Sequence, residues 1–205
     1  MNLKRIFDVV FSGIGLVVLT PLMIGIAILI RITMGSPVLF RQTRPGLNGV
    51  PFTLFKFRTM RNSPSEALAV ETDARRMTPL GSFLRKGSLD ELPELWNVFR
   101  GQMSLVGPRP LLMEYLEKYS AEQKRRMEVK PGLTGWAQIK GRNSLSWQEK
   151  FALDVWYVDH RSFWLDLWIL LLTVPVVVLG SGVSAPGEAT TKAFAGNGNR
   201  PGSLS

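Results

Sequence analysis

The sequence predicts an α+β protein, mainly helical, in which an N-terminal re-entrant membrane helix precedes interfacial amphipathic helices and a small cytoplasmic domain with a short β element. Three observations predict this fold. One apolar run fills residues 6–30, a second fills residues 163–180, and turn signals followed by alternating apolar residues lie between them, at residues 41–60. With 205 residues, the chain is long enough for one ordinary domain plus a membrane segment.

The first apolar run, IFDVVFSGIGLVVLTPLMIGIAILI, is long enough to cross a hydrocarbon core, for which about 20 helical residues suffice. Lys4 and Arg5 precede it and three arginines follow it, so both flanks favour the cytoplasmic side. Pro21 removes a backbone donor near the middle, and Thr20 can hydrogen-bond a carbonyl freed there. We therefore predict that residues 1–35 enter the membrane and return on the same face. A plain kinked transmembrane helix is the alternative.

The middle of the chain contains turn and strand signals. Pro-Gly and Asn-Gly followed by FTLFKFRTM predict a turn and then a strand that ends in Lys56 and Arg58. We expect a short helix around residues 66–70 in a polar loop, and a surface helix over residues 111–129. The glycine-rich residues 130–143 indicate a loop or a short strand pair.

The C-terminal part begins with SWQEKFALDVWYVDHRS, which predicts an amphipathic helix leading into the second apolar run. That run is short for a span and starts with aromatic residues, which favours a helix in the plane of the headgroups. A buried core helix is the alternative. Residues 181–205 are rich in Gly, Ser, Ala and Pro, so we expect a disordered tail.

Charge and composition limit the partners. The 25 Lys and Arg against 16 Asp and Glu give a formal net charge of +9, which indicates an anionic partner such as nucleic acid, phospholipid headgroups or a phosphorylated small molecule. The chain has no cysteine, which excludes disulfides and thiolate metal sites. We interpret His160, the single histidine, as solvated or capping, because one imidazole without partners forms no catalytic or metal site.

An acidic pair, Asp90 and Glu91, stands in the middle of GSFLRKGSLDELPELWNVFRGQMSLVGPRP. A capping box that starts at Ser88 would account for Glu91. Pro93 instead favours a helix start at Asp90, because proline is tolerated among the free amides of a first turn. Either start places Asp90 at a helix N-terminus, where free N–H groups and the helix dipole stabilise a carboxylate and attract a phosphate.

Cations flank this acidic pair. Arg85 precedes it, and Pro108 and Pro110 hold the backbone extended around Arg109, so that its planar guanidinium has little freedom left to lose. A rigid turn with a solvated arginine is the alternative interpretation. The residues alone predict a protein that handles phosphates at a membrane surface, with Asp90 as a candidate nucleophile.

Four stretches of this chain, in this order, resemble the bacterial sugar transferases called monotopic phosphoglycosyl transferases: FRQTRPGLNGVPFTLFKFRTM, LGSFLRKGSLDELPELWNVFRGQMSLVGPRP, KPGLTGWAQIKGR and LDVWYVDHRSFWLDLWILLLT. The resemblance runs from about residue 3 to about residue 173 and is closest to the small, minimal form of the family. It implies a re-entrant membrane helix over residues 1–35 and a catalytic domain over residues 36–180. Thr20 departs from the family, in which serine is frequent before the proline.

The resemblance implies that a UDP-sugar gives its phosphosugar to polyprenol phosphate, releasing UMP, on the cytoplasmic face of the bacterial inner membrane. This would be the first membrane step of glycoconjugate biosynthesis. Asp90 would be the nucleophile that carries a covalent phosphosugar, and Glu91 would orient Asp90 or join it in binding Mg²⁺. The substrate-binding residues predicted on this basis are Arg85, Pro108, Arg109, Pro110, Lys56 and Arg58.

The alternative from another class is a non-enzymatic basic membrane anchor that recruits partners. It accounts for the charge and for both apolar runs, but not for the motif around the acidic pair. We do not expect a nucleic-acid partner, because the aromatic residues cluster with the apolar runs instead of forming a platform in a soluble domain. The phospholipid bilayer is the third expected partner, and a homo-oligomer is left open.

Overall fold

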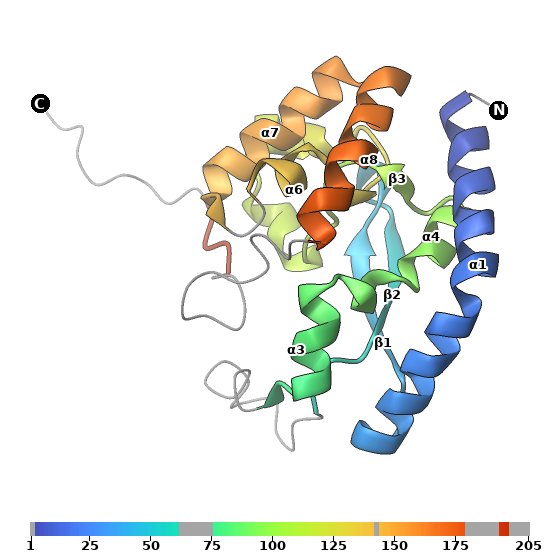
Figure 1. Ribbon diagram of the computed structural model, residues 1–205. Helices are drawn as coiled ribbons and strands as arrows, with labels where there is room; N and C mark the ends of the chain where they lie inside the picture. Colours follow the sequence, from blue (N-terminus) through green and yellow to red (C-terminus); the bar gives the residue numbers. More distant parts are fainter. Residues whose placement is uncertain (1–2, 62–75, 142–143, 179–192, 197–205) are drawn as a thin grey trace, which may run out of the picture.

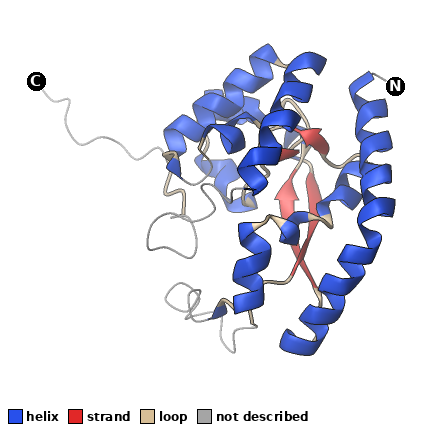
Figure 2. Cartoon of the chain, in the orientation of Figure 1, coloured by secondary structure: helices blue, strands red, loops and turns tan. Residues whose placement is uncertain are grey.

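The computed structural model of the protein describes residues 3–61, 76–141, 144–178 and 193–196, in which helices surround two small sheets (Figure 1, Figure 2). The helices are α1 (Leu3–Met34), α3 (Pro79–Lys86), α4 (Glu94–Phe99), α5 (Ala121–Lys124), α6 (Trp136–Lys140), α7 (Trp147–His160) and α8 (Phe163–Val178). The strands are β1 (Leu39–Pro45), β2 (Pro51–Phe57), β3 (Ser104–Val106) and β4 (Gly132–Thr134). This architecture confirms the mainly helical α+β prediction.

Helix α1 packs one face along the rest of the protein and leaves the other face exposed (Figure 1). An ideal Cβ at Gly13 would lie 3.5 Å from the Phe99 ring, and one at Gly15 would lie 3.3 Å from Leu95, so small residues let α1 approach α4 closely. The exposed face of α1 is apolar along its length. Among the described residues, α1 is the one helix long and apolar enough to cross a membrane.

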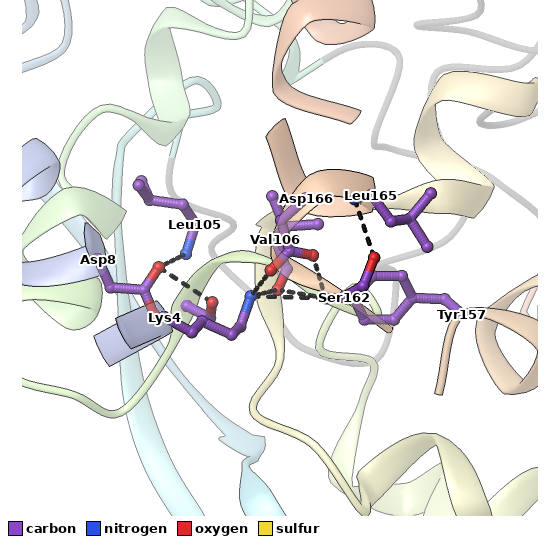
Figure 3. A network of polar contacts seen from close by, with 9 residues as sticks. Lys4, Asp8, Leu105, Val106, Tyr157, Ser162, Leu165 and Asp166 are labelled. Carbon is purple, nitrogen blue, oxygen red and sulfur yellow. Dashed lines mark hydrogen bonds and ion pairs between the residues drawn. The ribbon is translucent and has the colours of Figure 1, made fainter. Parts of the chain in front are cut away.

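The N-terminal end of α1 is fastened to β3 and α8 by a polar network (Figure 3). The Lys4 ammonium forms an ion pair with the Asp166 carboxylate and donates a hydrogen bond to the Val106 carbonyl at 3.1 Å. The Asp8 carboxylate, which is buried, accepts a hydrogen bond from the Leu105 backbone N–H at 3.0 Å. Lys4 therefore binds the domain itself, a use that the sequence did not predict for this cation.

Two arginines extend these attachments to both ends of α1. Arg5 donates to the carbonyls of Val98 and Phe99, each at 2.7 Å, and so caps the end of α4. Arg58, which is buried, donates to the carbonyl oxygens of residues 34–36, where α1 ends. The helix has 32 residues, about 48 Å of length, and both of its ends are held by the same domain.

The middle of α1 differs from the expected helix-break-helix. The helix continues through Pro21 without interruption, although its axis changes direction in its second half (Figure 1). Thr20 Oγ1 donates to the Leu16 carbonyl at 2.5 Å. The carbonyl that loses its helical partner at Pro21 is that of Val17, four residues earlier, so this bond is not the one expected for Thr20. The predicted break at Pro21 is therefore wrong, because the helix accommodates the proline and stays continuous. The re-entrant topology stays a prediction.

The predicted turn and strand are confirmed as a β-hairpin. Strands β1 and β2 pair antiparallel, from Leu39 opposite Phe57 to Pro45 opposite Pro51. The connection uses Asn48 with φ 53° and Gly49 with φ 77°, which are the backbone conformations that an Asn-Gly sequence favours. Strand β3 pairs parallel with β4, so residues 130–143 supply a strand and then α6.

The surface helix expected over residues 111–129 is wrong. The chain forms a 3₁₀ helix at Met113–Lys118, then α5, then a 3₁₀ turn at Arg125–Met127. The break has a physical cause, because Tyr115 and Tyr119 turn into a buried aromatic cluster and Ser120 starts a new helix with a capping box. The short helix expected around residues 66–70 lies outside the described residues.

Helices α7 and α8 confirm the two predicted C-terminal helices. Helix α8 buries Asp166 and Ile169 against the domain, as the core-helix alternative expects, while Trp164 and Trp168 are exposed. A position in the plane of the headgroups stays a prediction. In the tail, residues 193–196 are ordered against the domain, and Phe194 is 2% exposed. For these four residues the prediction of disorder does not hold; the rest of residues 181–205 lies outside the described residues.

Candidate functional site

The acidic pair lies in a single 3₁₀ turn, Leu89–Glu91, between α3 and α4. Ser88 adopts a left-handed conformation with φ 53° and makes no capping hydrogen bond, so the capping box proposed for it is absent. Helix α4 begins at Glu94, which leaves Asp90 ahead of it. The helix start at Asp90 is therefore wrong, and nearby cations replace the helix dipole as the main compensation for its charge.

Glu91 is held by two cations. Its Oε1 lies 2.7 Å from Lys56 Nζ and 2.5 Å from Arg109 Nη2. Burial alone would raise the pKa of Glu91, but the charges of Arg109 and Lys56 outweigh it and hold that pKa well below its usual range. Glu91 is thus an anion that orients a lysine from β2 and an arginine from the segment after β3.

Asp90 is buried beside this group, at 8% exposure. Burial raises the pKa of Asp90 and the charge of Glu91 adds to that effect, while Lys56, Arg85 and Arg109 oppose it. Arg85, at the end of α3, is oriented by a 3.0 Å hydrogen bond from its Nε to the Thr59 hydroxyl. The site therefore combines a desolvated carboxylate with three cations, a setting that suits an anionic ligand.

Helix α3 can hold Arg85 in this place because it lies directly on the end of the hairpin. A Cβ at Gly81 would lie 1.9 Å from the Thr59 carbonyl oxygen, so only glycine permits this contact. Thr78 caps the helix by accepting from the Gly81 N–H at 2.9 Å. Close packing between the backbones of Gly81 and Thr59 thus brings α3 against the end of the hairpin.

Arg109 is not a free surface arginine, because its guanidinium pairs with Glu91, although its side chain is 43% exposed. Its backbone is also fixed on both sides. The Pro108 carbonyl accepts from the Gly132 N–H at 3.0 Å, and the Arg109 carbonyl accepts from Arg126 Nη2 at 2.7 Å. The proline-flanked segment is thus held between β4 and a buried arginine that the sequence did not single out.

Glu94 is a third carboxylate that sequence reasoning missed. It is 2% exposed, and its Oε1 lies 3.1 Å from Lys56 Nζ as an ion pair, although that atom makes no hydrogen bond of good geometry. Opposite charges attract at this range in any orientation, so Glu94 and Lys56 form an ion pair. No local signal marks Glu94, because Asp90 lies outside α4 and the partner Lys56 comes from a distant strand.

Burial raises the pKa of Glu94 to about 7, opposed by Lys56 and assisted by Glu91. Between its ordinary value of 4.5 and 7 the folded state holds a proton that the unfolded state has lost, so the free energy of unfolding falls as pH rises through this window. We expect Glu94→Gln to reduce this fall. The difference in free energy of unfolding between variant and parent should be more favourable to the variant at about pH 8 than at about pH 5, by less than about 3 kcal/mol. Thermal melts at the two pH values measure the effect.

The exposed Glu117→Gln is the matched control and should leave the pH dependence unchanged. A buried carboxylate, Asp90, acts in the same direction, so part of the fall should persist in the Glu94 variant. If Glu94→Gln lowered stability equally at both pH values, Glu94 would be ionised throughout and tightly paired with Lys56.

Lys56 and Arg58, both predicted to bind substrate, lie in different places. Lys56 lies in the carboxylate cluster, whereas the guanidinium of Arg58 holds the end of α1, so substrate binding by Arg58 stays a prediction. His160 Nδ1 lies 2.8 Å from the Trp156 carbonyl, which agrees with a capping role.

Magnesium binding by Asp90 and Glu91 also stays a prediction. Within the described ranges, no group of three or more His, Cys, Asp or Glu side chains could hold a metal ion. Mg²⁺ commonly uses one or two carboxylates together with substrate phosphates, however, and the adjacent carboxylates of Asp90 and Glu91 fit that donor set.

A long apolar helix with an exposed face is typical of membrane-associated proteins, and the buried carboxylates and converging cations form a candidate site for an anionic ligand. The chain belongs to the bacterial sugar transferase family, whose model matches residues 1–180, and it is a transferase. The resemblance noted from the four sequence stretches is thereby confirmed.

Relatives match most of the chain. The chain is 52% identical over 200 residues to the uncharacterized sugar transferase EpsL of Bacillus subtilis (strain 168), covering 97% of this chain and 98% of that protein. It is 42% identical over 183 residues to the UDP-glucose:undecaprenyl-phosphate glucose-1-phosphate transferase of Caulobacter vibrioides, covering 84% of this chain and 68% of the relative. It is 39% identical over 197 residues to the UDP-galactose-lipid carrier transferase of Erwinia amylovora, covering 88% of this chain and 41% of the relative.

Proposed function

We propose that this protein moves a phosphosugar from a UDP-sugar to undecaprenyl phosphate, a polyprenol phosphate, and releases UMP. The observation that carries the proposal is the buried Asp90 beside a Glu91 that Arg109 and Lys56 hold in place. Relatives named as UDP-sugar and undecaprenyl-phosphate transferases support the same general reaction. The product would be the first lipid-linked sugar of a glycoconjugate.

In the first step, a carboxylate oxygen of Asp90 attacks the sugar-linked phosphorus of the donor. A new bond forms between Asp90 and phosphorus, the bond between that phosphorus and the bridging oxygen breaks, and UMP leaves with the electron pair. In the second step, a phosphate oxygen of undecaprenyl phosphate attacks the same phosphorus and displaces Asp90 as a free carboxylate. The lipid then holds a diphosphate-linked sugar.

The cations have defined tasks in these steps. An anionic nucleophile must approach an anionic phosphate, so Arg85 and Arg109 offset the repulsion and stabilise the charge that develops on the phosphoryl oxygens. Glu91 keeps Arg109 and Lys56 in position. Mg²⁺ held by Asp90 and Glu91 would supply further charge neutralisation on the diphosphate.

The membrane-anchor alternative gives no reason for the site. Burying Asp90, Glu91 and Glu94 together costs free energy, because desolvation disfavours each charged carboxylate. A protein that only recruited partners would gain nothing from this arrangement, whereas a phosphoryl transferase uses it.

An assay of UMP tests the proposed function. Purified protein in lipid nanodiscs is incubated with undecaprenyl phosphate and, one at a time, with UDP-sugars that differ in the sugar. At least one donor should give UMP in the presence of the lipid acceptor. Folded protein that released no UMP from any donor in the panel would overturn the proposal.

We also propose that the domain and both ends of α1 lie on the cytoplasmic side of the bacterial inner membrane. Basic residues on both flanks support this topology, as do the attachments of Lys4, Arg5 and Arg58 to a single domain. If α1 crossed the bilayer, the Lys4 and Arg58 contacts would lie on opposite sides of the membrane.

Cysteine labelling measures this topology, since the chain has no native cysteine. We expect Asn2→Cys and Ser36→Cys to resist a membrane-impermeant thiol reagent in intact cells, and both to react after permeabilisation. Ser36→Cys is the matched control for the domain side. Ready labelling of Asn2→Cys in intact cells, without labelling of Ser36→Cys, would mean that α1 spans the bilayer.

A further inference from the structure

The C-terminal segment of residues 193–196 is fixed in a defined place on the domain. Phe194 is 2% exposed, its backbone N–H donates to the Tyr115 hydroxyl at 3.0 Å, and its carbonyl accepts from Lys118 Nζ at 3.3 Å. The ring lies 5.6 Å from the Trp147 ring and 5.1 Å from the Phe151 ring, centroid to centroid. A segment that comes after the last apolar helix is thus anchored by one buried aromatic side chain.

This segment completes an aromatic cluster, defined as Tyr115, Tyr119, Trp147, Phe151 and Phe194. Two of its members contact Arg126. The Arg126 Cζ atom lies 5.8 Å from the Tyr119 ring centroid and 5.7 Å from that of Phe151, and Arg126 Nη1 lies 3.4 Å from the Tyr119 hydroxyl. Phe194 packs against both rings on which the guanidinium rests.

Arg126 in turn connects this cluster to the candidate site. It is 4% exposed, its Nε and Nη2 donate to Asp154 Oδ2 at 3.1 and 2.7 Å, and the same Nη2 donates to the Arg109 carbonyl at 2.7 Å. Because a guanidinium is planar and rigid, Asp154 at its edge and the Tyr119 and Phe151 rings beside it together set the direction of its bond to Arg109. The Arg109 side chain then contacts Glu91.

We propose that Phe194 is a positioning residue of the transferase site, acting through Arg126 on the backbone of Arg109. The inference rests on the proposed function and adds to it a role for the C-terminal segment. Without the Phe194 ring, Tyr119 and Phe151 lose a packing partner, and the Arg126 guanidinium gains freedom to move. Arg109 then binds the donor phosphates from a less defined position, and small misplacements of such a group are costly.

The kinetic test is a double-mutant cycle between Phe194→Ala and Arg109→Lys. We expect Phe194→Ala to raise the KM for the UDP-sugar at least about tenfold while the KM for undecaprenyl phosphate stays within about twofold. In the Arg109→Lys background, Phe194→Ala should change the donor KM by less than about twofold, because the group through which it acts is already altered. Additive effects on the donor KM would overturn the proposal.

Two further variants separate positioning from stability. Ile169→Ala truncates a fully buried residue of a different core cluster and should lower the melting temperature without changing the donor KM. Phe194→Leu retains most of the apolar volume and should restore most of the donor affinity. Should Phe194→Ala fail to fold, the same cycle is run with Tyr119→Phe in its place, which removes the hydroxyl near Arg126.

Side-chain NMR of ¹⁵N-labelled arginine gives a readout that does not need turnover. The Arg109 Nε signal, assigned by its loss in Arg109→Lys, should shift or broaden in Phe194→Ala and stay unchanged in Ile169→Ala. If parent protein releases no UMP, the proposed function fails, yet this signal still tests the link from Phe194 to Arg109. An Arg109 signal that is identical in Phe194→Ala and the parent would refute the positioning role, and a lower donor KM in Phe194→Ala would do so as well.

Discussion

Asp90→Asn is expected to lower UMP release by on the order of 10³-fold or more, because an amide has nearly the shape of the carboxylate but cannot attack phosphorus. The fold should survive, since Asp90 lies in a buried site where its charge is already disfavoured and its pKa is raised. UMP release with a UDP-sugar and undecaprenyl phosphate measures the loss, and a thermal melt checks the fold.

Mass spectrometry identifies the residue that carries the phosphosugar. Parent protein mixed with donor alone and quenched in acid should hold one phosphosugar on the peptide that contains Asp90, and the Asn variant should hold none. Glu91→Gln is the matched control. This variant should lose activity, but it should still form the adduct, because Asp90 is unchanged. An adduct on another residue, or substantial turnover by Asp90→Asn, would remove Asp90 from the role of nucleophile.

Arg109→Lys should reduce kcat/KM for the UDP-sugar by on the order of 10²-fold, because lysine keeps the charge and loses the planar fork that contacts carboxylate and phosphate together. Arg109 pairs with Glu91, and that pairing together with the Glu91 charge raises the pKa of its guanidinium, so the parent side chain stays charged at any working pH. Steady-state kinetics with varied donor measure the effect.

Arg125→Lys is the matched control for this substitution. Arg125 is a surface arginine paired with Glu122 and Asp159, and exposed pairs of this kind contribute little. Its kinetics should equal those of the parent. If Arg109→Lys also behaved like the parent, Arg109 would serve to neutralise Glu91 and would not bind the donor.

Local signals in the sequence were sufficient for the elements whose structure depends on neighbours in the chain. The Asn-Gly turn gave the β1–β2 hairpin, and the spacing of apolar residues gave α7 and α8. Residues 111–129 could not be predicted in this way, because their charged and apolar spacing is helical while Tyr115 and Tyr119 are drawn into contacts with Phe194, about 75 positions further on.

The site shows the same division. The sequence motifs predict four residues of the site that the structure brings together, namely Asp90, Glu91, Arg109 and Lys56. Glu94 was missed because its partner, Lys56, comes from a strand 38 positions earlier, and the sequence does not show which strand packs against which turn.

The predicted uses of Arg58 and Lys4 illustrate a further difficulty. A basic residue beside an apolar run is typical of a topology marker or a phosphate ligand, and the sequence contains no sign of a buried carbonyl or carboxylate that will take it instead. Arg58 binds carbonyls at the end of α1, and Lys4 binds Asp166. Both contacts require a three-dimensional neighbour that is distant in the chain.

The attachment of α1 at both ends has a mechanical consequence. A helix anchored at one end can tilt to match a thicker or thinner bilayer at modest cost. Helix α1 cannot tilt alone, because Lys4 and Arg58 fasten its two ends to one body. If the proposed membrane placement holds, the whole protein would therefore rise, sink or rotate together in a membrane of different acyl-chain length. The distance between Asp90 and the exposed apolar side of α1 would then stay constant while lipid composition varies.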